Sequence, residues 1–297
     1  MLHGRVSSTK GFFVFSVASL LFVPGSRPDR FAKAKAGGAD LTVIDLEDAV
    51  AADDKASARD AALGQIAQSA GEESGGWAIR INAVTTAAGI RDLAALADAE
   101  TLPETLLVPM VETATEIGVM TGALGDRCPA LVPLVETPRG LRHALEIVSR
   151  DAVTALMFGG GDFSGELGVE LAWEPLLTAR QQVILACAEA KKPAIDVPFI
   201  QLENEAGLAQ ECAAARAIGF VAKAAIHPRQ VPAITAAFAP SEAEVAEARE
   251  ALAAYEAGGG RAIRFKGKML EAPFVKKYRA TLARAQSSQD FRESFNA

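Results

Sequence analysis

Eight short apolar runs alternate with longer helix-like stretches along most of this 297-residue chain. Strands that are covered by helices on both faces of a parallel sheet have such continuous apolar sequences. The pattern therefore predicts an α/β fold, the (β/α)8 barrel, with one strand in each run. The runs are Ser19–Gly25, Leu41–Asp48, Trp77–Asn82, Thr105–Glu112, Ala130–Thr137, Thr154–Gly160, Pro193–Phe199 and Phe220–Pro228.

An open, doubly wound sheet is the alternative to a closed barrel. That fold places a Gly-rich phosphate-binding turn after its first strand. Here the first run is followed by Pro24-Gly25-Ser26-Arg27-Pro28, which lacks the GxGxxG spacing. The closed barrel is thus the favoured interpretation.

We expect three regions along the chain. Residues 1–18 form an irregular N-terminal extension, residues 19–240 the barrel, and residues 241–297 a charged helical region that could close a site as a lid. The segment 1–23 has a basic start and an apolar run, as secretory signals do, but it passes into Pro24-Gly25 without a small-residue cleavage site. We interpret its end as a buried first strand.

Composition excludes some partners. The formal net charge is −7, and no long basic run is present, so nucleic acid is not the expected partner. The apolar run before Pro24 is too short to span a bilayer, and no membrane association is expected. Three cysteines without a CxxC spacing, Cys128, Cys187 and Cys212, suit reduced thiols and a cytoplasmic location.

Charged and polar residues follow the predicted strands, where a barrel of this kind builds its site. Each has a structural alternative, because an acid after a strand is often the N-cap of the next helix. Glu112 fits that alternative best, His227 could orient the last loop, and Lys223 could either neutralise acids or bind an anion. The full set is Asp45, Glu47, Asp48, Arg80, Asn82, Glu112, Glu136, Asp162, Asp196, Lys223 and His227.

Two of these acids, Glu136 and Asp162, follow adjacent predicted strands and form a minimal protein contribution to a Mg²⁺ site. No His or Cys spacing suits zinc. Arg80 offers a planar fork for a carboxylate. Glycines 159–161 would expose backbone N–H groups to the same anion, which makes Gly160, Gly161 and Asp162 candidate substrate-binding residues.

These groups suit a keto acid or hydroxy acid held on a metal, and a divalent ion stabilises the enolate formed in aldol-type reactions. Nucleophilic catalysis is the other option, but the chain has neither a GxSxG elbow nor a positioned Cys and His pair. The residues therefore favour a metal-assisted lyase.

Several stretches resemble, in order, motifs of the citrate lyase β-subunit-like branch of the HpcH/HpaI aldolase superfamily. The resemblance covers about residues 19–232, with a weaker echo at 267–285. The motifs are "LLFVPGSRPDRFAKA", "DLTVIDLEDAV", "IRIN", "LVPLVETPRG", "LMFGGGDFSGELG", "AIDVPF", "GFVAKAAIHPRQV" and "GKMLEAPFVKKYRATLARA".

The resemblance implies a TIM barrel that assembles as a homotrimer or as a hexamer of two trimers, with Mg²⁺ on Glu136 and Asp162. It implies that Arg80 binds the acyl carboxylate and helps to stabilise the enolate, with Asp45, Glu47, Asp48 and Lys223 as supporting rim residues. The basic residues Arg27, Arg30 and Lys33 would lie near the phosphates of CoA, and their alternative role is a solvated helix start.

The activity that the resemblance implies is cleavage of a 3-hydroxyacyl-CoA such as malyl-, citramalyl- or citryl-CoA. Hydrolysis of malyl-CoA and a β-subunit role on a carrier-bound substrate are the alternatives. The chain departs from many relatives at Met110, where they have Lys, and at Ala222, where they have Gly. Glu271 stands where relatives carry an Asp that reaches a neighbouring subunit's site as acid or base, so it is a candidate catalytic residue.

Overall fold

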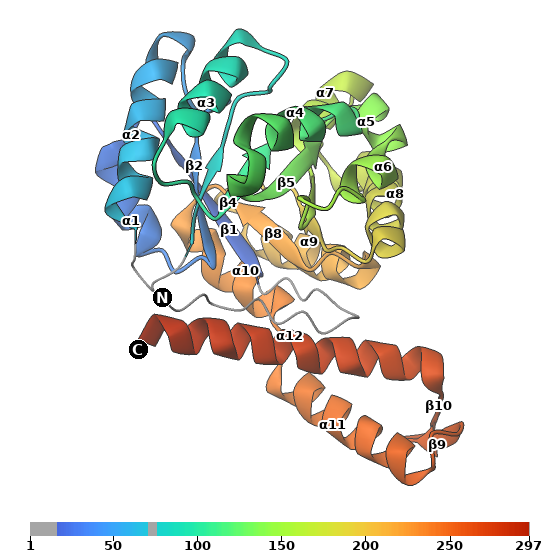
Figure 1. Cartoon of the computed structure of the whole chain (residues 1–297). Coiled ribbons are helices and arrows are strands. Elements are labelled where there is room, and N and C mark those ends of the chain that lie inside the picture. The colour runs from blue at the N-terminus through green and yellow to red at the C-terminus, as the bar shows by residue number, and fades with distance from the viewer. Residues whose placement is uncertain (1–16, 71–75, 297) are drawn as a thin grey trace.

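The computed structural model describes residues 17–70 and 76–296 and contains a closed barrel of eight parallel strands in sequence order (Figure 1). The predicted fold class is confirmed, and the open doubly wound sheet is wrong, because β1 pairs with β8 and leaves no edge. The strands are β1 Ser19–Pro24, β2 Leu41–Asp45, β3 Trp77–Arg80, β4 Thr105–Val108, β5 Ala130–Val135, β6 Leu156–Phe158, β7 Ala194–Asp196 and β8 Ala222–Ala225.

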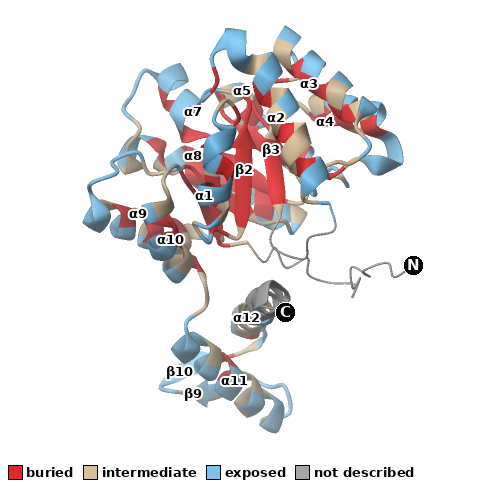
Figure 2. Ribbon diagram, turned by 90° about the vertical axis from the view of Figure 1, so that its left-hand side faces the viewer, coloured by how far each residue is buried: buried red, intermediate tan, exposed pale blue. Residues whose placement is uncertain are grey.

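Helices surround this barrel on its outer side, and their inner faces are buried (Figure 2). Most observed strands are shorter than the predicted runs, because the polar residues at the run ends belong to the following loops or helices. The helices of the barrel are α1 Phe31–Lys35, α2 Lys55–Gln68, α3 Ala87–Asp98, α4 Ala114–Leu124, α5 Pro138–Arg142, α6 Ala144–Val148, α7 Gly160–Leu167, α8 Trp173–Ala190, α9 Glu205–Ile218 and α10 Val231–Phe238.

Alternation along the strands divides the core into two layers. Side chains at every second position, such as Val43, Leu107 and Met157, form a cluster to which all eight strands contribute, and this cluster fills the barrel. The residues between them, such as Ile44 and Leu106, pack against the helices in the larger outer cluster. A residue's parity on its strand therefore decides whether it faces the barrel interior or the helix layer.

Lys223 and Asp196 are sequence neighbours of inward-facing residues on their strands, so their side chains point toward the helices and not into the barrel interior. Lys223 Nζ lies 2.6 Å from Asp196 Oδ2 and 2.6 Å from Glu211 Oε1 on α9, while Arg180 Nε on α8 lies 2.9 Å from Asp196 Oδ1. Asp196 and Lys223 are fully buried between sheet and helices. The expectation that Lys223 supports the rim is wrong, because its inward neighbours on β8 are Ala222 and Ala224.

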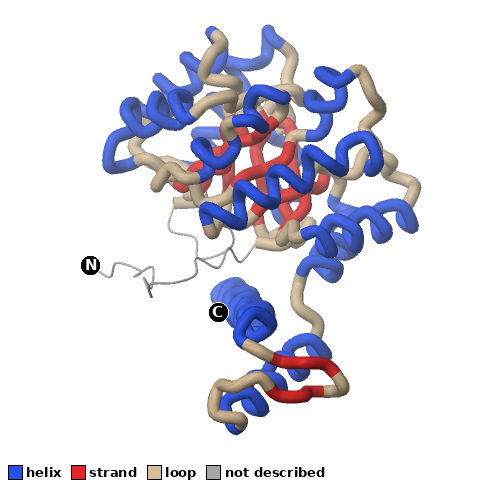
Figure 3. The backbone as a smooth tube through the Cα atoms, turned by 90° about the vertical axis from the view of Figure 1, so that its right-hand side faces the viewer, coloured by secondary structure: helices blue, strands red, loops and turns tan. Residues whose placement is uncertain are grey.

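The C-terminal region is a separate small layer beside the barrel. It consists of α11 Glu242–Ala257, the hairpin of β9 Ile263–Phe265 and β10 Lys268–Leu270, and α12 Ala272–Asn296, and it lies to one side of the barrel (Figure 3). The hairpin packs Leu270 against Ala251 and Val275 of the two helices. These contacts give the region a small core of its own.

This region contacts the barrel at the N-terminal end of the strands, whereas a lid over the chain's own site would have to reach their C-terminal end. Arg284 Nη2 on α12 donates to the carbonyl oxygens of Phe238, at 2.6 Å, and of Val221, at 3.1 Å. Val221 directly precedes β8, so the contact lies at the N-terminal end of the strands. The expectation of a lid over the same chain's barrel mouth is therefore not met.

The N-terminal expectations fall mostly outside the described residues, since residues 1–16 are not among them. The part of segment 1–23 that is described runs into β1, as expected. Within residues 17–70 and 76–296, no helix combines the length and the apolar character that crossing a bilayer requires.

Replacing Lys223 by Met tests the buried ion network. The change leaves Glu211 without its buried cation and Asp196 with Arg180 alone, and breaking a buried pair costs about 3–5 kcal/mol of unfolding free energy. We expect a loss of that size in urea unfolding. The matched control is Lys266→Met, which removes an ion pair with Glu250 whose two side chains are more than half exposed; it should leave stability unchanged. Equal midpoints for both variants would contradict the assigned role of the network.

Candidate active site

Asp45 and Arg80 are the paired last residues of β2 and β3, and both point into the barrel mouth. Arg80 Nε lies 2.7 Å from Asp45 Oδ1, and Arg80 Nη2 lies 2.7 Å from Asp45 Oδ2. The buried Asp45 carboxylate also accepts the backbone N–H groups of Glu47 and Ala49. The loop after β2 and the guanidinium are thereby fixed to the same carboxylate.

Two more acids hold the other side of Arg80. Its Nη1 lies 2.8 Å from Glu47 Oε2 and 3.3 Å from Asp48 Oδ2, and the guanidinium stands 5.1 Å from the centre of the Phe22 ring. Burial works against the charge of Arg80, but the hydrogen bonds and the charge of Asp45 raise the pKa of Arg80 above its ordinary value. The guanidinium is therefore permanently charged.

These contacts change the expected role of Arg80. A guanidinium has five N–H groups, and three of them donate hydrogen bonds to Asp45 and Asp48 in the described chain, which leaves one N–H on Nη2 and one on Nη1, the latter on the nitrogen that stands beside Glu47. The bidentate fork is thus used on Asp45, not kept for a substrate carboxylate. Arg80 is arranged to give a ligand oxygen one charged hydrogen bond.

Glu47 is the most perturbed acid of this cluster. Its burial raises its pKa to about 9 against the opposing effect of Arg80, and the charges of Glu136, Asp48 and Asp45 act in the same direction as burial. Glu47 therefore carries a proton near neutral pH and adds no negative charge beside Arg80.

Glu136 follows β5 and enters the cavity from the neighbouring wall. Its Oε2 accepts the backbone N–H of Met110 at 2.6 Å. Met110 has a left-handed φ of +54°, which costs a non-glycine residue about 1 kcal/mol and directs this N–H. Burial raises the pKa of Glu136 to about 7, the Met110 N–H and Arg80 oppose that rise, and the charges of Asp162 and Asp48 add to it.

The three glycines after β6 have three different functions. A Cβ on Gly159 would collide with the side chain of Glu136, so glycine is required there for that carboxylate to fit. Gly160 is buried, and its backbone packs closely against Leu171 and Val197. Gly161 is open. The expectation that Gly160 presents its backbone to a ligand is not supported, because it does not line the cavity, whereas Gly161 does.

Asp162 follows β6, as predicted, and lies in the first turn of α7. Its pKa is raised by partial burial and by the charges of Asp48 and Glu166, while Arg80 opposes the rise. The position brings its carboxylate to the same cavity as Glu136 and Arg80. The predicted convergence of these three side chains is thus present in the fold.

The cavity has a volume of about 410 Å³ and a clear charge imbalance. Among the described residues, the ionisable side chains that line it are Arg80 and the acids Asp45, Asp48, Glu136 and Asp162. Burial is the main cause of the raised pKa values of Glu136 and Asp162, and the charges of neighbouring acids add to it. Two hard oxygen donors in need of positive charge fit Mg²⁺, which fills its other positions with water or substrate oxygens.

No group of three or more His, Cys, Asp and Glu within residues 17–70 and 76–296 could hold a metal by itself. A site that supplies only two carboxylates therefore does not suit a closed structural metal. It suits an open one, at which a substrate completes the coordination.

Other predicted residues have structural roles. Glu112 accepts a hydrogen bond from the Thr137 hydroxyl, and His227 Nδ1 accepts the N–H of Arg229, so both fit their structural alternatives. Asn82 donates to Asp92. Arg27 forms an exposed ion pair with Asp29 at 2.7 Å.

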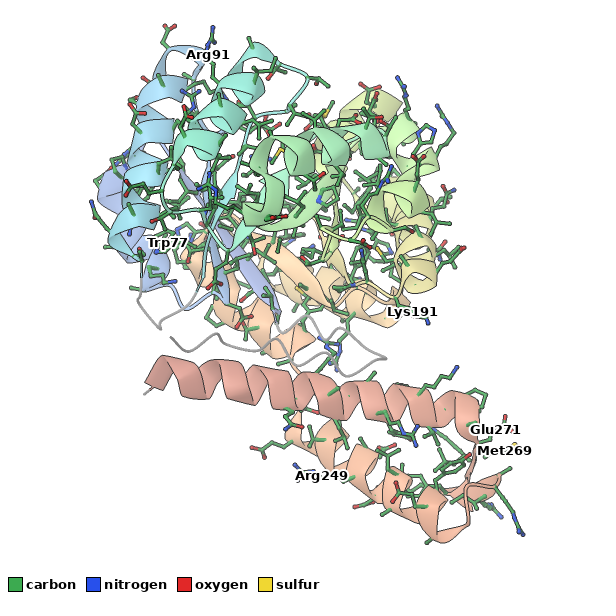
Figure 4. All side chains as sticks on the ribbon, viewed as in Figure 1. Trp77, Arg91, Lys191, Arg249, Met269 and Glu271 are labelled. Atoms are coloured by element: carbon green, nitrogen blue, oxygen red, sulfur yellow. The ribbon has the colours of Figure 1, made fainter. Side chains whose placement is uncertain are left out.

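The remaining candidates do not reach this cavity. Arg30 and Lys33, in the first helical segment, do not line it. Glu271 lies at the far end of the C-terminal region, beside Met269 and away from the barrel (Figure 4).

Comparison with known proteins decides the family. The model of the HpcH/HpaI aldolase/citrate lyase family matches residues 18–228. The chain belongs to this family. The match spans all eight strands of the barrel and all three converging side chains, so it includes the part of the chain that forms the cavity.

Individual members of the HpcH/HpaI family match over most of the chain. The (3S)-malyl-CoA thioesterase of Cereibacter sphaeroides is 32% identical, over 93% of this chain and 97% of the relative. The mitochondrial citramalyl-CoA lyase of Homo sapiens is 29% identical, over 92% and 86%. The crystal structure of CitE from Mycobacterium tuberculosis in complex with magnesium, acetoacetate and coenzyme A has a TM-score of 0.75 and 32% identity, over 90% of this chain and 97% of that chain.

Sequence reasoning missed Phe22 and Met110 as parts of the site, and it gave Gly159 a different role, that of exposing its backbone to an anion. Phe22 and Gly159, like Asp45 and Arg80, each come two residues after an inward-facing residue. Counting alternate residues along each strand could therefore have placed both of them at the cavity. The left-handed conformation of Met110 has no such signal, because the sequence gives no turn residue there.

Replacing Glu47 by Gln tests its buried proton. A carboxyl group whose pKa is raised from 4.5 when exposed to about 9 in the fold keeps a proton that the unfolded chain releases, so it lowers the unfolding free energy as pH rises through this window. We expect urea midpoints of metal-free wild type to fall relative to those of Glu47→Gln between about pH 5 and pH 9. Parallel pH curves for the two proteins would show that Glu47 is ionised in the fold.

Proposed function

We propose that this chain is a Mg²⁺-dependent carbon–carbon lyase that cleaves a 3-hydroxyacyl-CoA thioester of the malyl or citramalyl type. The observation that carries the proposal is the convergence of Glu136, Asp162 and Arg80 in one negatively charged cavity. The citramalyl-CoA lyase relative and the structural neighbour with magnesium and coenzyme A support it.

The residues fit Mg²⁺, and Glu136 and Asp162 would hold it. When bound, the cation polarises the oxygens of the keto acid portion of the substrate. The protein's own contribution is to keep the two carboxylates in place. Glu136 is fixed by the Met110 N–H and by the space that Gly159 leaves, and Asp162 is fixed by the first turn of α7.

Cleavage needs one proton removed and one charge stabilised. The 3-hydroxyl group loses its proton, its oxygen forms the carbonyl of a keto acid, and the C2–C3 bond breaks with its electron pair left on the thioester fragment as an enolate. The remaining Nη2 N–H of Arg80 can donate to the enolate oxygen, a charged hydrogen bond that strengthens as charge develops. Asp45 sets the position of that donor.

The proton-transfer group in this proposal is Glu271 of a neighbouring copy. Within one chain Glu271 lies in the C-terminal region, away from the barrel (Figure 4), and this region contacts the barrel at the N-terminal end of the strands, whereas the cavity lies at their C-terminal end. Exposed apolar side chains flank it: Met269 is 66% and Phe274 51% exposed. The mouth of the cavity carries Ile200 at 56% and Ile226 at 42%. We infer that these surfaces meet between copies, in a homotrimer or a hexamer.

Hydrolysis of a malyl-CoA-type thioester is the second candidate, supported by the thioesterase relative. Hydrolysis would use the same charged side of the cavity as the lyase reaction, but water would be added at the thioester carbonyl. Action as a β subunit on a carrier-bound substrate remains the third. For the lyase and the thioesterase candidates, we propose that the CoA phosphates lie near Arg27, Arg30 and Lys33. The three free thiols suit the proposed cytoplasmic location.

Purified protein tests the lyase proposal directly. With Mg²⁺ it should release pyruvate from citramalyl-CoA or glyoxylate from malyl-CoA, and chelation should stop the reaction. Glu136→Ala and Asp162→Ala should each lower turnover at least about a thousandfold and remove Mg²⁺ binding in calorimetry, because each deletes one of two protein ligands. The exposed Glu174→Ala is the control. Free thiol and malate without acetyl-CoA would identify the thioesterase instead, and unchanged turnover in both ligand variants would overturn the metal assignment.

Mixing variants tests the shared site. Glu136→Ala and Glu271→Gln should each be inactive as separate proteins, because one lacks a ligand and the other a proton-transfer group. Co-expressed in one oligomer, they should regain a fraction of wild-type turnover, since some interfaces combine an intact Glu136 with an intact Glu271. Full activity of Glu271→Gln alone would remove this residue from the reaction.

A further inference from the structure

The cavity has an apolar side as well as a charged one. Its apolar side consists of Leu171 after α7, Val197 and Pro198 after β7, Ile200 beyond them, and Ile226 after β8. This group, called the alkyl wall below, borders the same space as Glu136 and Asp162. The proposed bond-breaking step assigns no role to it, although Ile200 and Ile226, its outermost members, also belong to the surface inferred to meet a neighbouring copy.

The alkyl wall begins next to the reacting groups. A Cβ placed on Gly160 would lie 3.1 Å from Leu171 Cδ1 and 3.2 Å from Val197 Cγ1. Gly160 is two residues before Asp162, so these two side chains pack on the backbone that carries this carboxylate. Leu171 and Val197 also line the cavity that Glu136 and Asp162 line, so a substituent on the reacting carbon of a substrate held there lies within reach of the wall.

Among the described residues, no basic side chain lines this side of the cavity to receive a negative substituent. Arg80 is the one basic side chain among the described residues that line the cavity, and three of its N–H groups already donate to Asp45 and Asp48. A carboxylate turned toward the alkyl wall would lose water without gaining a partner, which is strongly unfavourable. An alkyl group in the same place would bury apolar surface, which is favourable.

We propose that the alkyl wall selects substrates whose reacting carbon carries an alkyl substituent, and that Val197, Leu171 and Ile200 determine this specificity. The inference rests on the proposed lyase function and narrows its substrate class. Malyl-, citramalyl- and citryl-CoA differ at this carbon by hydrogen, methyl and carboxymethyl. The wall favours methyl over hydrogen and rejects carboxymethyl.

The expected discrimination follows from the kind of contact. One methyl group in an apolar pocket changes kcat/KM by about 10- to 200-fold. We therefore expect citramalyl-CoA to exceed malyl-CoA by at least about tenfold. A carboxylate left unpaired costs more than a methyl group gains, so citryl-CoA should fall at least about a hundredfold below citramalyl-CoA. Equal or higher kcat/KM for citryl-CoA would overturn the inference.

Binding of keto acids separates this inference from the lyase function. Pyruvate and oxaloacetate, the products of the methyl and carboxymethyl substrates, differ by one carboxylate. Calorimetry with Mg²⁺ and each keto acid should show at least about tenfold tighter binding of pyruvate, even if no thioester is cleaved. Absence of cleavage of all three thioesters would overturn the proposed function alone. Equal binding of the two acids would overturn the alkyl wall alone.

A charge placed on the wall should reverse the preference. Ile200 is 56% exposed, so Ile200→Arg can be accommodated without rebuilding the core. This variant should raise the citryl-to-citramalyl ratio of kcat/KM, and the oxaloacetate-to-pyruvate affinity ratio, at least about tenfold by pairing the extra carboxylate. Ile90→Arg is the matched control, because Ile90 is 60% exposed on α3 and does not line the cavity. It should leave both ratios unchanged. Unchanged ratios in Ile200→Arg would exclude Ile200 from specificity.

Discussion

Closure of the barrel by pairing β1 with β8 is the constraint on which the site depends. Leu20 lies opposite Ala224 across this seam, and every strand then has two neighbours. Because all eight strands are parallel, their carboxyl ends meet on one face, and side chains distant in sequence reach one cavity there. Asp45, Arg80 and Glu136 share that face only because the sheet closes.

Charge balance then determines what the cavity can hold. Asp45 and Asp48 accept hydrogen bonds from three of the N–H groups of Arg80, and the cavity is lined by four acids and this single cation among the described residues. Burial raises the pKa values of Glu136 and Asp162, so a bound cation would favour their charged forms. The geometry thus links a permanently charged hydrogen-bond donor with two carboxylates for a divalent metal. This is the combination that a reaction through an enolate requires.

The same structure separates catalytic charge from structural charge. Asp196, Lys223 and Arg180 form a buried network of the same residue types as the site, but it lies between the sheet and the helices and fixes β7 and β8 to α8 and α9. The C-terminal region likewise contacts its own barrel through structural interactions. Its contact through Arg284 lies at the N-terminal end of the strands, away from the cavity.

The sequence by itself determined the barrel, its eight strands and the residues Glu136, Asp162 and Arg80, because continuous apolar runs and polar run ends are local signals. It did not determine that Lys223 faces the helices, since a shift of one residue on a short strand moves a side chain to the other face of the sheet. Only the tertiary structure decided that Gly159 makes room for Glu136, that the fork of Arg80 is occupied by Asp45, and that Leu171 and Val197 form an apolar side beside Asp162. Each of these depends on contacts between segments far apart in the chain, and a local pattern of residues does not encode such distances.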